Sequence, residues 1–381
     1  MAEIIRIGPF HPALLEPEVF EVTVKDGKIV KVDIDLGYAH RSIEKLMTTK
    51  TYRQNVFLAE RVCGICSMAH STAYCQTAER IIDAQVPDRA RYLRSIFFEL
   101  ERLESHYLWF AVLSHALHKE DYFLKIMADR EQLMDLFENL TGNRVHYAVN
   151  QIGGTKMDLT PQGIEKAKDV LHNLRGLSDY ILQTTDEKGE IAQKTKGLGI
   201  LPRDKALALG VVGPTLRGSG IRSDTRKDDP YTAYGELDFN VPVGLDGDVY
   251  SRALVRARET VESLNMIEQA LDNLPSGLVQ GEVGFPLETE AVGRVEAPRG
   301  ELFYFIKSDG TDVPERVKIR TPSYMNDYSV THMLLGEELA NFQIITESVD
   351  PCFSCTDRLT IIDQDTGKKR RTLLSELGRR K

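Results

Sequence analysis

The segment RVCGICSMAH, residues 61–70, contains a Cys-x-x-Cys pair formed by Cys63 and Cys66. A second pair, Cys352 and Cys355, lies in the segment DPCFSCTDR near the other end of the chain. Two intervening residues allow both sulfurs of a pair to face one ion. Four thiolates suit zinc, an iron–sulfur cluster or nickel. The two pairs therefore predict one four-sulfur site and leave its metal open.

The distance along the chain between the two pairs indicates what the site is for. A structural zinc motif normally closes within a few tens of residues, whereas residues 67–351 separate these pairs. Such a site must be assembled by the whole fold, which favours a buried catalytic centre over a structural staple. The fifth cysteine, Cys75, has no partner in the sequence and is expected to be a small buried apolar residue.

The composition is that of a soluble globular protein, with 42% hydrophobic and 28% charged residues. We expect no transmembrane helix, because there is no apolar run of the required length. The N-terminus lacks the basic-then-apolar pattern of a signal peptide, so the chain is expected in the cytoplasm, where structural disulfides are not expected. A net charge of −9 argues against binding nucleic acid.

The pattern of apolar residues predicts an α+β fold that is predominantly helical. Alternating apolar residues on both sides of Asp26-Gly27 predict a hairpin near the N-terminus, and residues 301–324 predict two strands around a turn. Thr160 and Pro161 are typical of a helix start. The predicted helical stretches are 42–85, 86–118, 122–140, 160–186 and 246–274.

We expect a single domain over residues 1–381, built as a long-helix bundle with small β-sheets at both chain ends. Residues 1–41 form its N-terminal β region, residues 42–275 its helical core, and residues 276–381 a C-terminal β and loop region that contains the second cysteine pair.

Several polar residues near the two pairs suit a metal that carries anionic ligands. His70 follows Cys66 by four residues and lies on the same face if the segment is helical. Arg299, in EAPRG, precedes a predicted strand, and Ser323 lies in RTPS. A guanidinium and a hydroxyl are suitable hydrogen-bond donors to such ligands.

Eight stretches spread over nearly the whole chain together carry a family resemblance. They are GPFHPALLEP (8–17), HRSIEKL (40–46), ERVCGICSMAHS (60–71), TGNRVHYAVNQIGG (141–154), GPTLRGSG (213–220), EAPRGEL (296–302), RTPSYMN (320–326) and DPCFSCTDR. With these stretches the chain resembles the large subunit of a nickel–iron hydrogenase, and within that family the energy-converting, membrane-associated group related to the 49-kDa subunit of respiratory complex I.

The resemblance implies a nickel–iron centre in which Cys63 and Cys352 are terminal nickel ligands. Cys66 and Cys355 would bridge nickel and iron, and the iron would carry carbon monoxide and two cyanide ligands. Around the centre, the resemblance implies an outer shell that comprises Pro298, Arg299, Ser323, Asp350 and His70.

The resemblance also implies a proton route. The thiolate of Cys355 would accept a proton, Glu16 would carry it away, and Arg299 would face the open metal position. The alternative for Glu16 is an ordinary solvated carboxylate. Glu44 would lie near a second site for magnesium or iron, or on a proton path, and its alternative is a helix salt bridge. Asp224 and Arg226 match a stretch near the active site without an implied task.

The C-terminal tail departs from many relatives, which are cleaved near the position of Arg358 during maturation. Residues 359–381 are still present in this chain. They include a predicted strand and turn at 359–367 and a basic terminus. That terminus is expected to be solvated, or to contact a partner subunit or an anionic membrane surface.

The function implied is reversible formation of hydrogen from protons with electrons from reduced ferredoxin. The implied partners are a small subunit with a [4Fe-4S] cluster, a ferredoxin-like iron–sulfur subunit, and complex I-like hydrophilic and membrane subunits that translocate ions. The chain would be peripheral, at the cytoplasmic face of the membrane. Two alternatives stay open: a related subunit acting on a quinone or a sulfur compound, and a four-cysteine zinc scaffold.

Overall fold

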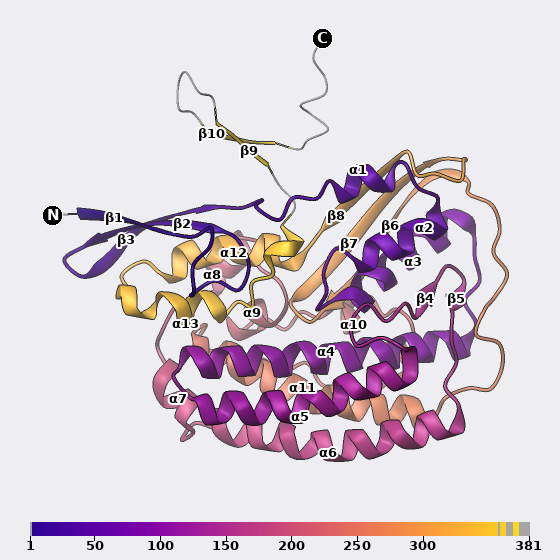
Figure 1. Ribbon diagram of the computed structural model, residues 1–381, viewed down its shortest axis with the longest axis horizontal. Helices are drawn as coiled ribbons and strands as arrows, with labels where there is room; N and C mark the ends of the chain where they lie inside the picture. The colour runs from indigo at the N-terminus through magenta and orange to yellow at the C-terminus, as the bar shows by residue number, and fades with distance from the viewer. Residues whose placement is uncertain (1, 357–358, 363–368, 373–381) are drawn as a thin grey trace, which may run out of the picture.

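A computed structural model of the chain describes residues 2–356, 359–362 and 369–372. Within these residues the fold is a helical bundle with small antiparallel sheets, which confirms the predicted fold class (Figure 1). The division into three regions of one domain stays a prediction. None of the helices in the described ranges is both long and apolar enough to cross a membrane.

A three-stranded antiparallel sheet forms the N-terminal end. It contains β1 (Ala2–Ile7), β2 (Val19–Lys25) and β3 (Lys28–Asp35), in that order. Asp26 and Gly27 have φ values of 53° and 79°, as the predicted hairpin turn requires. The β1–β2 connection runs back over the body of the molecule, and it brings residues 8–18 near the second cysteine pair (Figure 1).

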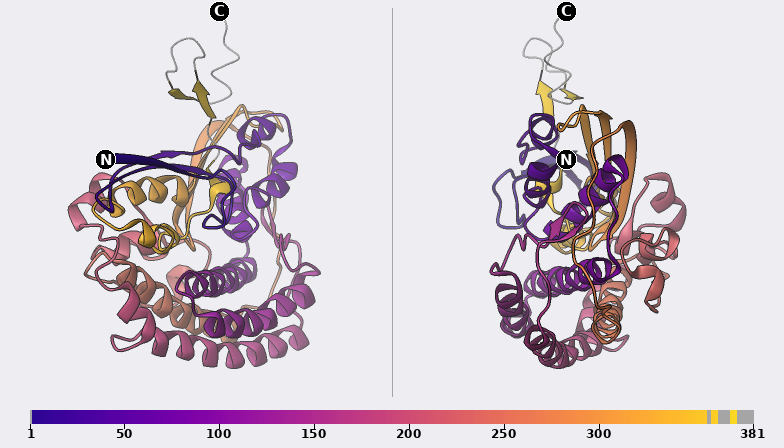
Figure 2. Two further views of the ribbon diagram at one scale, coloured as in Figure 1. Left: turned by 60° about the vertical axis from the view of Figure 1, so that its left-hand side comes forward. Right: turned by 90° about the vertical axis from the view of Figure 1, so that its right-hand side faces the viewer.

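Four long helices make the bundle. They are α4 (Asp88–Ala116), α5 (Glu120–Thr141), α6 (Pro161–Thr185) and α11 (Val249–Asp272). The helices α4 and α6 each pack against both α5 and α11, so the four close into a bundle (Figure 2). Thr160 caps α6 as predicted, because its hydroxyl accepts a hydrogen bond from the Gly163 N–H at 3.0 Å.

A second three-stranded sheet lies on the other side of the molecule from α6. Its strands are β6 (Glu288–Ala297), β7 (Gly300–Asp309) and β8 (Arg316–Arg320). The helix α3 (Ser67–Ile82) packs on β6 and β7. This contact is close: a Cβ at Gly293 would lie 2.4 Å from Thr77 Oγ1. The strand β6 lies before the segment in which the sequence predicted strands.

The predicted helical stretch 42–85 is three helices rather than one. It contains α1 (Ile43–Met47), α2 (Tyr52–Glu60) and α3. The loop between α2 and α3 carries the first cysteine pair. The short elements between α5 and α11 are β4 (Asn150–Gln151), β5 (Gly154–Thr155), α7 (Glu190–Thr195), α8 (Arg203–Ala208), α9 (Gly213–Gly218), α10 (Thr225–Asp228) and η1 (Tyr234–Glu236).

The chain after β8 returns to the N-terminal sheet and then to the first cysteine loop. It forms α12 (Pro322–Met333), η2 (Leu339–Asn341), α13 (Phe342–Glu347) and η3 (Phe353–Cys355). Beyond it, β9 (Leu359–Ile362) confirms the predicted strand and pairs with β10 (Lys369–Thr372). The predicted turn at 363–368, Arg358, and the ends of the basic terminus lie outside the described residues.

Candidate metal centre

All four paired cysteines lie at the ends of short loops that meet in the interior. Cys63 follows α2, and Cys66 directly precedes α3. Cys352 directly precedes the single turn of η3, and Cys355 is its last residue. Their residues are only 2–5% exposed. The fold thus brings together the two pairs that the sequence separates.

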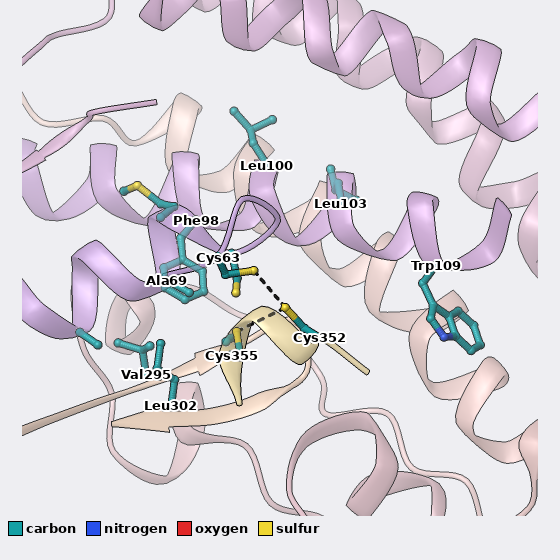
Figure 3. Close-up of a cluster of buried hydrophobic side chains, with 14 of the residues drawn as sticks. Cys63, Ala69, Phe98, Leu100, Leu103, Trp109, Val295, Leu302, Cys352 and Cys355 are labelled. Atoms are coloured by element: carbon teal, nitrogen blue, oxygen red, sulfur yellow. Dashed lines mark hydrogen bonds between the residues drawn. The ribbon is translucent and has the colours of Figure 1, made fainter. Parts of the chain in front are cut away.

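The sulfur atoms converge without forming a disulfide. Cys63 Sγ lies 3.3 Å from Cys352 Sγ, which in turn lies 3.4 Å from Cys355 Sγ; a disulfide would need about 2.05 Å. The sulfurs of Cys63, Cys66 and Cys355 all lie within 4.8 Å of one another. Figure 3 shows Cys63, Cys352 and Cys355 pointing toward a common point among apolar side chains.

The electrostatics of this cluster favour a bound cation. Hydrogen bonds from the thiols of Cys355 and Cys63 lower the pKa of Cys66 to about 7. Hydrogen bonds to Cys352, Cys63 and Cys66, and then burial, raise the pKa of Cys355 well above its usual value. Four buried thiolates at this separation repel one another. A thiophilic cation removes that conflict, because it binds the deprotonated sulfurs.

The residues fit a metal site by their chemistry as well as by their distances. Four thiolates select soft or borderline metals such as nickel, iron and zinc over magnesium or calcium. Metal–sulfur bonds of about 2.3 Å require sulfur atoms a little under 4 Å apart, and the observed separations need only a small expansion. The site therefore fits the predicted metal ligands Cys63, Cys66, Cys352 and Cys355.

Arg299 lies beside the cysteines at the turn between β6 and β7. Gly213 and Gly300 make this close approach possible, because a Cβ at Gly213 would lie 2.3 Å from the Arg299 carbonyl oxygen. Its guanidinium donates to Asp350 Oδ1 at 2.6 Å and to the Asp350 carbonyl at 2.8 Å. Burial opposes the charge of Arg299, but Asp350 and the cysteine thiolates together raise its pKa. The guanidinium is thus a fixed cation at the site.

Ser323 and Pro298 lie next to Cys352 and Arg299, respectively. The Cys352 N–H donates a hydrogen bond to Ser323 Oγ at 3.1 Å, which fixes the start of the second cysteine loop. Pro298 is buried in the turn that carries Arg299. The Asn326 side chain donates to the Arg299 carbonyl at 3.1 Å, and it ties that turn to α12.

His70 lies on the first turn of α3 and contacts the cluster without entering it. Its Nε2 is 3.7 Å from Cys355 Sγ, and its Nδ1 is 2.8 Å from the Tyr304 hydroxyl. Burial lowers the pKa of His70 to about 3, so the ring is neutral. A neutral ring that accepts from Tyr304 has its other N–H free to donate to the sulfur.

Glu16 reaches the second cysteine loop from the β1–β2 connection. Its carboxylate accepts a hydrogen bond from the Ser354 N–H at 2.9 Å and another from the Ser354 hydroxyl. The residue is half-buried. Glu16 therefore connects the loop between Cys352 and Cys355 with the exterior of the molecule.

In the described part of the chain, a lysine side chain and a backbone N–H hold the Glu44 carboxylate, rather than a set of metal-ligating side chains. Lys318 Nζ donates to its carboxylate at 2.7 Å, and the Ile319 N–H donates at 2.9 Å. Glu44 also lines a pocket that reaches Cys355, together with Arg41, Thr321 and Ser354. A metal or proton role for Glu44 stays a prediction.

Asp224 and Arg226 lie in a buried network of ion pairs beside the bundle. Arg226 donates to Asp224 at 2.7 Å and to Glu99 at 3.1 Å. The network continues through Arg217, which donates to Glu259 and to Glu296 of the EAPRG segment. This network connects the two residues with Glu296, three residues before Arg299.

Sequence reasoning missed the residues that reach the site from remote elements. Thr321 donates to the Cys355 carbonyl at 2.8 Å, and Glu101 accepts from the Met68 and Ala69 N–H groups at the start of α3. Burial raises the pKa of Glu101 to about 8. Cys75 is fully buried, as expected. Thr321 lies in the stretch RTPSYMN, which was singled out for Ser323 alone, and Glu101 lies in none of the motifs.

Comparisons with known proteins assign the family. The model of the respiratory-chain NADH dehydrogenase 49 Kd subunit matches residues 120–284 and 278–358, and the model of nickel-dependent hydrogenase matches residues 41–155. The carbon monoxide-induced hydrogenase of Rhodospirillum rubrum is 41% identical over 93% of this chain and 99% of its own length.

A second relative and a solved structure agree with this assignment. The membrane-bound hydrogenase subunit alpha of Pyrococcus furiosus is 36% identical over 96% of this chain and 89% of its own. A chain of the archaeal membrane-bound sulfane sulfur reductase superposes with a TM-score of 0.88, at 31% identity, over 94% of this chain and 98% of that one. The chain therefore belongs to the family of membrane-bound hydrogenase large subunits related to the 49-kDa subunit of respiratory complex I.

Proposed function

We propose that this chain is the catalytic subunit of a membrane-associated nickel–iron hydrogenase that forms and oxidises hydrogen reversibly. The observation that carries the proposal is the convergence of four buried cysteine sulfurs beside the Arg299–Asp350 pair. The similarity to two hydrogenase subunits over nearly their full lengths supports it.

In this proposal the four cysteines would hold nickel and iron, Cys63 and Cys352 as ligands of nickel alone and Cys66 and Cys355 as ligands shared by the two metals. When bound, these metals supply a Lewis-acidic, redox-active pair that splits hydrogen heterolytically. The protein around them supplies fixed charge and excludes water. Arg299 would provide a positive charge beside the cysteines, and His70 would donate a hydrogen bond to Cys355. Carbon monoxide and two cyanide ligands on the iron belong to the same proposal.

The proton leaves through the second cysteine loop. The Cys355 thiolate accepts it, and Glu16 carries it toward solvent, because the Glu16 carboxylate is hydrogen-bonded to Ser354 between the two cysteines. Proton transfer needs donor and acceptor within hydrogen-bond reach directly or through one water. The half-buried position of Glu16 suits the outward step.

Electrons must be exchanged with other subunits, because all four clustered cysteines are used by the site. We propose a small subunit with a [4Fe-4S] cluster, a ferredoxin-like subunit, reduced ferredoxin as the donor, and complex I-like membrane subunits that translocate ions. The chain would sit peripherally at the cytoplasmic face. The names of the relatives, which include membrane-bound complexes, support this arrangement.

A second candidate function is reduction of a sulfur compound or a quinone. The similarity to the sulfane sulfur reductase chain favours it. The four cysteines argue against the quinone, because binding a quinone needs no metal site with four thiolates. Against a sulfur compound, hydrogenase is supported by the higher identity to two hydrogenase subunits, 41% and 36%, than to the sulfane sulfur reductase chain, 31%.

Metal analysis of the purified complex tests the proposal. We expect one nickel per chain, infrared bands of iron-bound carbon monoxide and cyanide, and hydrogen evolution with a reduced low-potential donor. Zinc alone, with no such bands, would overturn the hydrogenase assignment. Polysulfide or quinone reduction without hydrogen evolution would establish the second candidate.

A further inference from the structure

Asp327 is a buried carboxyl group that the proposed reaction does not yet use. It lies on α12 with its residue only 1% exposed, and neither carboxyl oxygen has a hydrogen-bond partner among the described residues. Most buried polar groups in proteins are satisfied by protein or by ordered water. An isolated buried carboxylate is costly, so such a group either neutralises or finds a partner.

The position of Asp327 on α12 turns it toward the cysteine site. Ser323 lies four residues earlier, one helical turn away, and therefore shares its face of the helix. The Ser323 hydroxyl accepts from the Cys352 N–H at 3.1 Å. The preceding residue, Asn326, binds the Arg299 carbonyl. Asp327 thus lies on the face of α12 whose Ser323 contacts the second cysteine loop.

Four charged or titratable groups from three separate segments act on Asp327. Burial raises its pKa well above the usual value; Cys352, Asp350 and Glu16 raise it further, and Arg299 lowers it. Arg299 is the one cation in that set, and it already donates to Asp350 at 2.6 Å. Around Asp327 the negative groups therefore outnumber the positive ones.

A further buried acid, Glu347 at the end of α13, lies near the same ion pair. Burial raises the pKa of Glu347 to about 8, and the charges that act on it are those of Asp350 and Arg299. Cys352 and Glu16 are not in that set. Of these two acids, only Asp327 is thus acted on by both a cysteine of the site and the carboxylate of Glu16.

We propose that Asp327 is a second proton-carrying carboxyl of the cysteine site, held as a neutral acid and joined to Glu16 by buried water. A buried water suits this place, because it binds to otherwise unsatisfied buried polar groups. This inference rests on the proposed hydrogenase function.

The step moves protons only. When hydrogen is oxidised, the Asp327 O–H bond breaks as its proton passes through water to the Glu16 carboxylate. A proton released from hydrogen at the site then re-forms the O–H bond on Asp327. No electrons are exchanged in this step, so hydrogen formation runs it in reverse.

Infrared spectroscopy of the metal-free full chain tests the protonation state without any enzyme activity. We expect the difference between wild type and Asp327→Asn at neutral pH to show one lost carboxylic acid C=O band, which shifts in D2O. The exposed Asp312 supplies the control, because Asp312→Asn should remove a carboxylate and no acid band. An unchanged acid band in Asp327→Asn would mean that Asp327 is ionised and would overturn the proposal.

Hydrogen evolution by the purified complex tests the relay. We expect Asp327→Asn to lower the rate by roughly 10-fold to 100-fold with unchanged nickel content, and to change the pH profile, since general acid–base groups contribute on this scale. Asp327→Glu should restore most of the rate. An unchanged rate and pH profile in Asp327→Asn would overturn the relay even if the acid band is lost. A wild-type complex without hydrogen activity would instead defeat the proposed function, and the infrared result would still stand.

Discussion

Glu16 is the residue whose role the structure makes most accessible to mutation. The change Glu16→Gln keeps the shape of the side chain but removes its capacity to carry a proton. Because the carboxylate is held on Ser354 between Cys352 and Cys355, we expect hydrogen evolution to fall by roughly 10²- to 10⁴-fold with nickel retained. Rate assays on the purified complex, with metal analysis, measure this.

Glu3 on β1 is the matched control for Glu16, since it is an exposed glutamate of the same N-terminal region. The change Glu3→Gln should leave the rate unaltered. If Glu16→Gln also retains full activity, Glu16 is an ordinary loop carboxylate.

The four clustered cysteines should differ from Cys75 in how they retain metal. Replacement of any one of Cys63, Cys66, Cys352 or Cys355 by serine removes a thiolate ligand, and we expect nickel to be lost from the purified chain. Cys75→Ser should retain it, because burial raises the Cys75 pKa and the charged groups that act on it are Arg94, Glu79 and Glu60. Elemental analysis of the five variants decides the matter, and loss of nickel only in Cys75→Ser would refute the ligand assignment.

The residues that the structure brings together at the candidate site lie largely in motifs of the sequence, and their surroundings do not. Cysteine pairing and the flanking Arg299, Ser323 and Asp350 lie in short motifs that the sequence displays directly. Asp327 gave no such signal, since nothing in the sequence tells that its helix turns it inward. Long-range contacts of this kind depend on how elements pack, which local patterns do not encode.

At the scale of elements, the helix α4 departs from what its pattern suggests. Its apolar spacing predicts an amphipathic helix, whose polar face would normally meet water. In the structure that face is also buried: Glu99, Arg102 and Glu101 are each at most 1% exposed. Ion pairs and hydrogen bonds with other elements replace the solvent.

The strand β6 was not predicted, because its sequence pattern is too weak. Its first half is mostly exposed and rich in charge, and only its second half alternates into the core. An edge strand with one such face gives a weak alternating signal. The hairpin at Asp26-Gly27 and the cap at Thr160 were predictable because local backbone chemistry alone determines them.

The buried network that joins several helices depends on Glu99. It accepts hydrogen bonds from Arg102, Arg226, Tyr234 and Ser263, which come from four elements or loops. The change Glu99→Gln leaves two buried guanidinium groups short of a counter-charge, so we expect the free energy of unfolding to fall by about 3–5 kcal/mol. Urea denaturation measures it, with Glu268→Gln as a half-exposed control at under about 1 kcal/mol.

The same network predicts how stability depends on acid. Burial opposes ionisation of Glu99, but Arg102 and Arg226 lower its pKa to about 2. A lowered pKa means that stability is present above the unfolded value near 4.3 and is lost as pH falls toward 2. We expect a loss of roughly 3 kcal/mol over that window from this group, and Glu99→Gln should flatten the acid limb of a stability-against-pH curve. An equally steep limb in the variant would show that other carboxyls dominate.

At the scale of the molecule, the cysteine site joins the two ends of the fold. Cys63 and Cys352 are 289 residues apart in the chain and have their sulfurs 3.3 Å apart in space. The segments that meet there come from the α2–α3 loop, the η3 turn and the β1–β2 connection. A metal at this point therefore links the N-terminal sheet, the bundle and the C-terminal elements, so its binding should stabilise the whole molecule.

Metal-linked stability follows from this arrangement, because an ion that binds the folded chain alone stabilises it by mass action. At a free nickel(II) concentration about 100 times Kd, the gain is roughly 2.7 kcal/mol, and we expect calorimetry of the metal-free chain to show a matching rise in Tm. Cys63→Ser should abolish that rise and Cys75→Ser should keep it, since only the former removes a sulfur of the cluster. Chelation should reverse the rise, and stability should fall with acid as the thiolates regain protons. A rise in Tm that survives Cys63→Ser would place the nickel elsewhere and would separate the stability of the fold from its cysteine site.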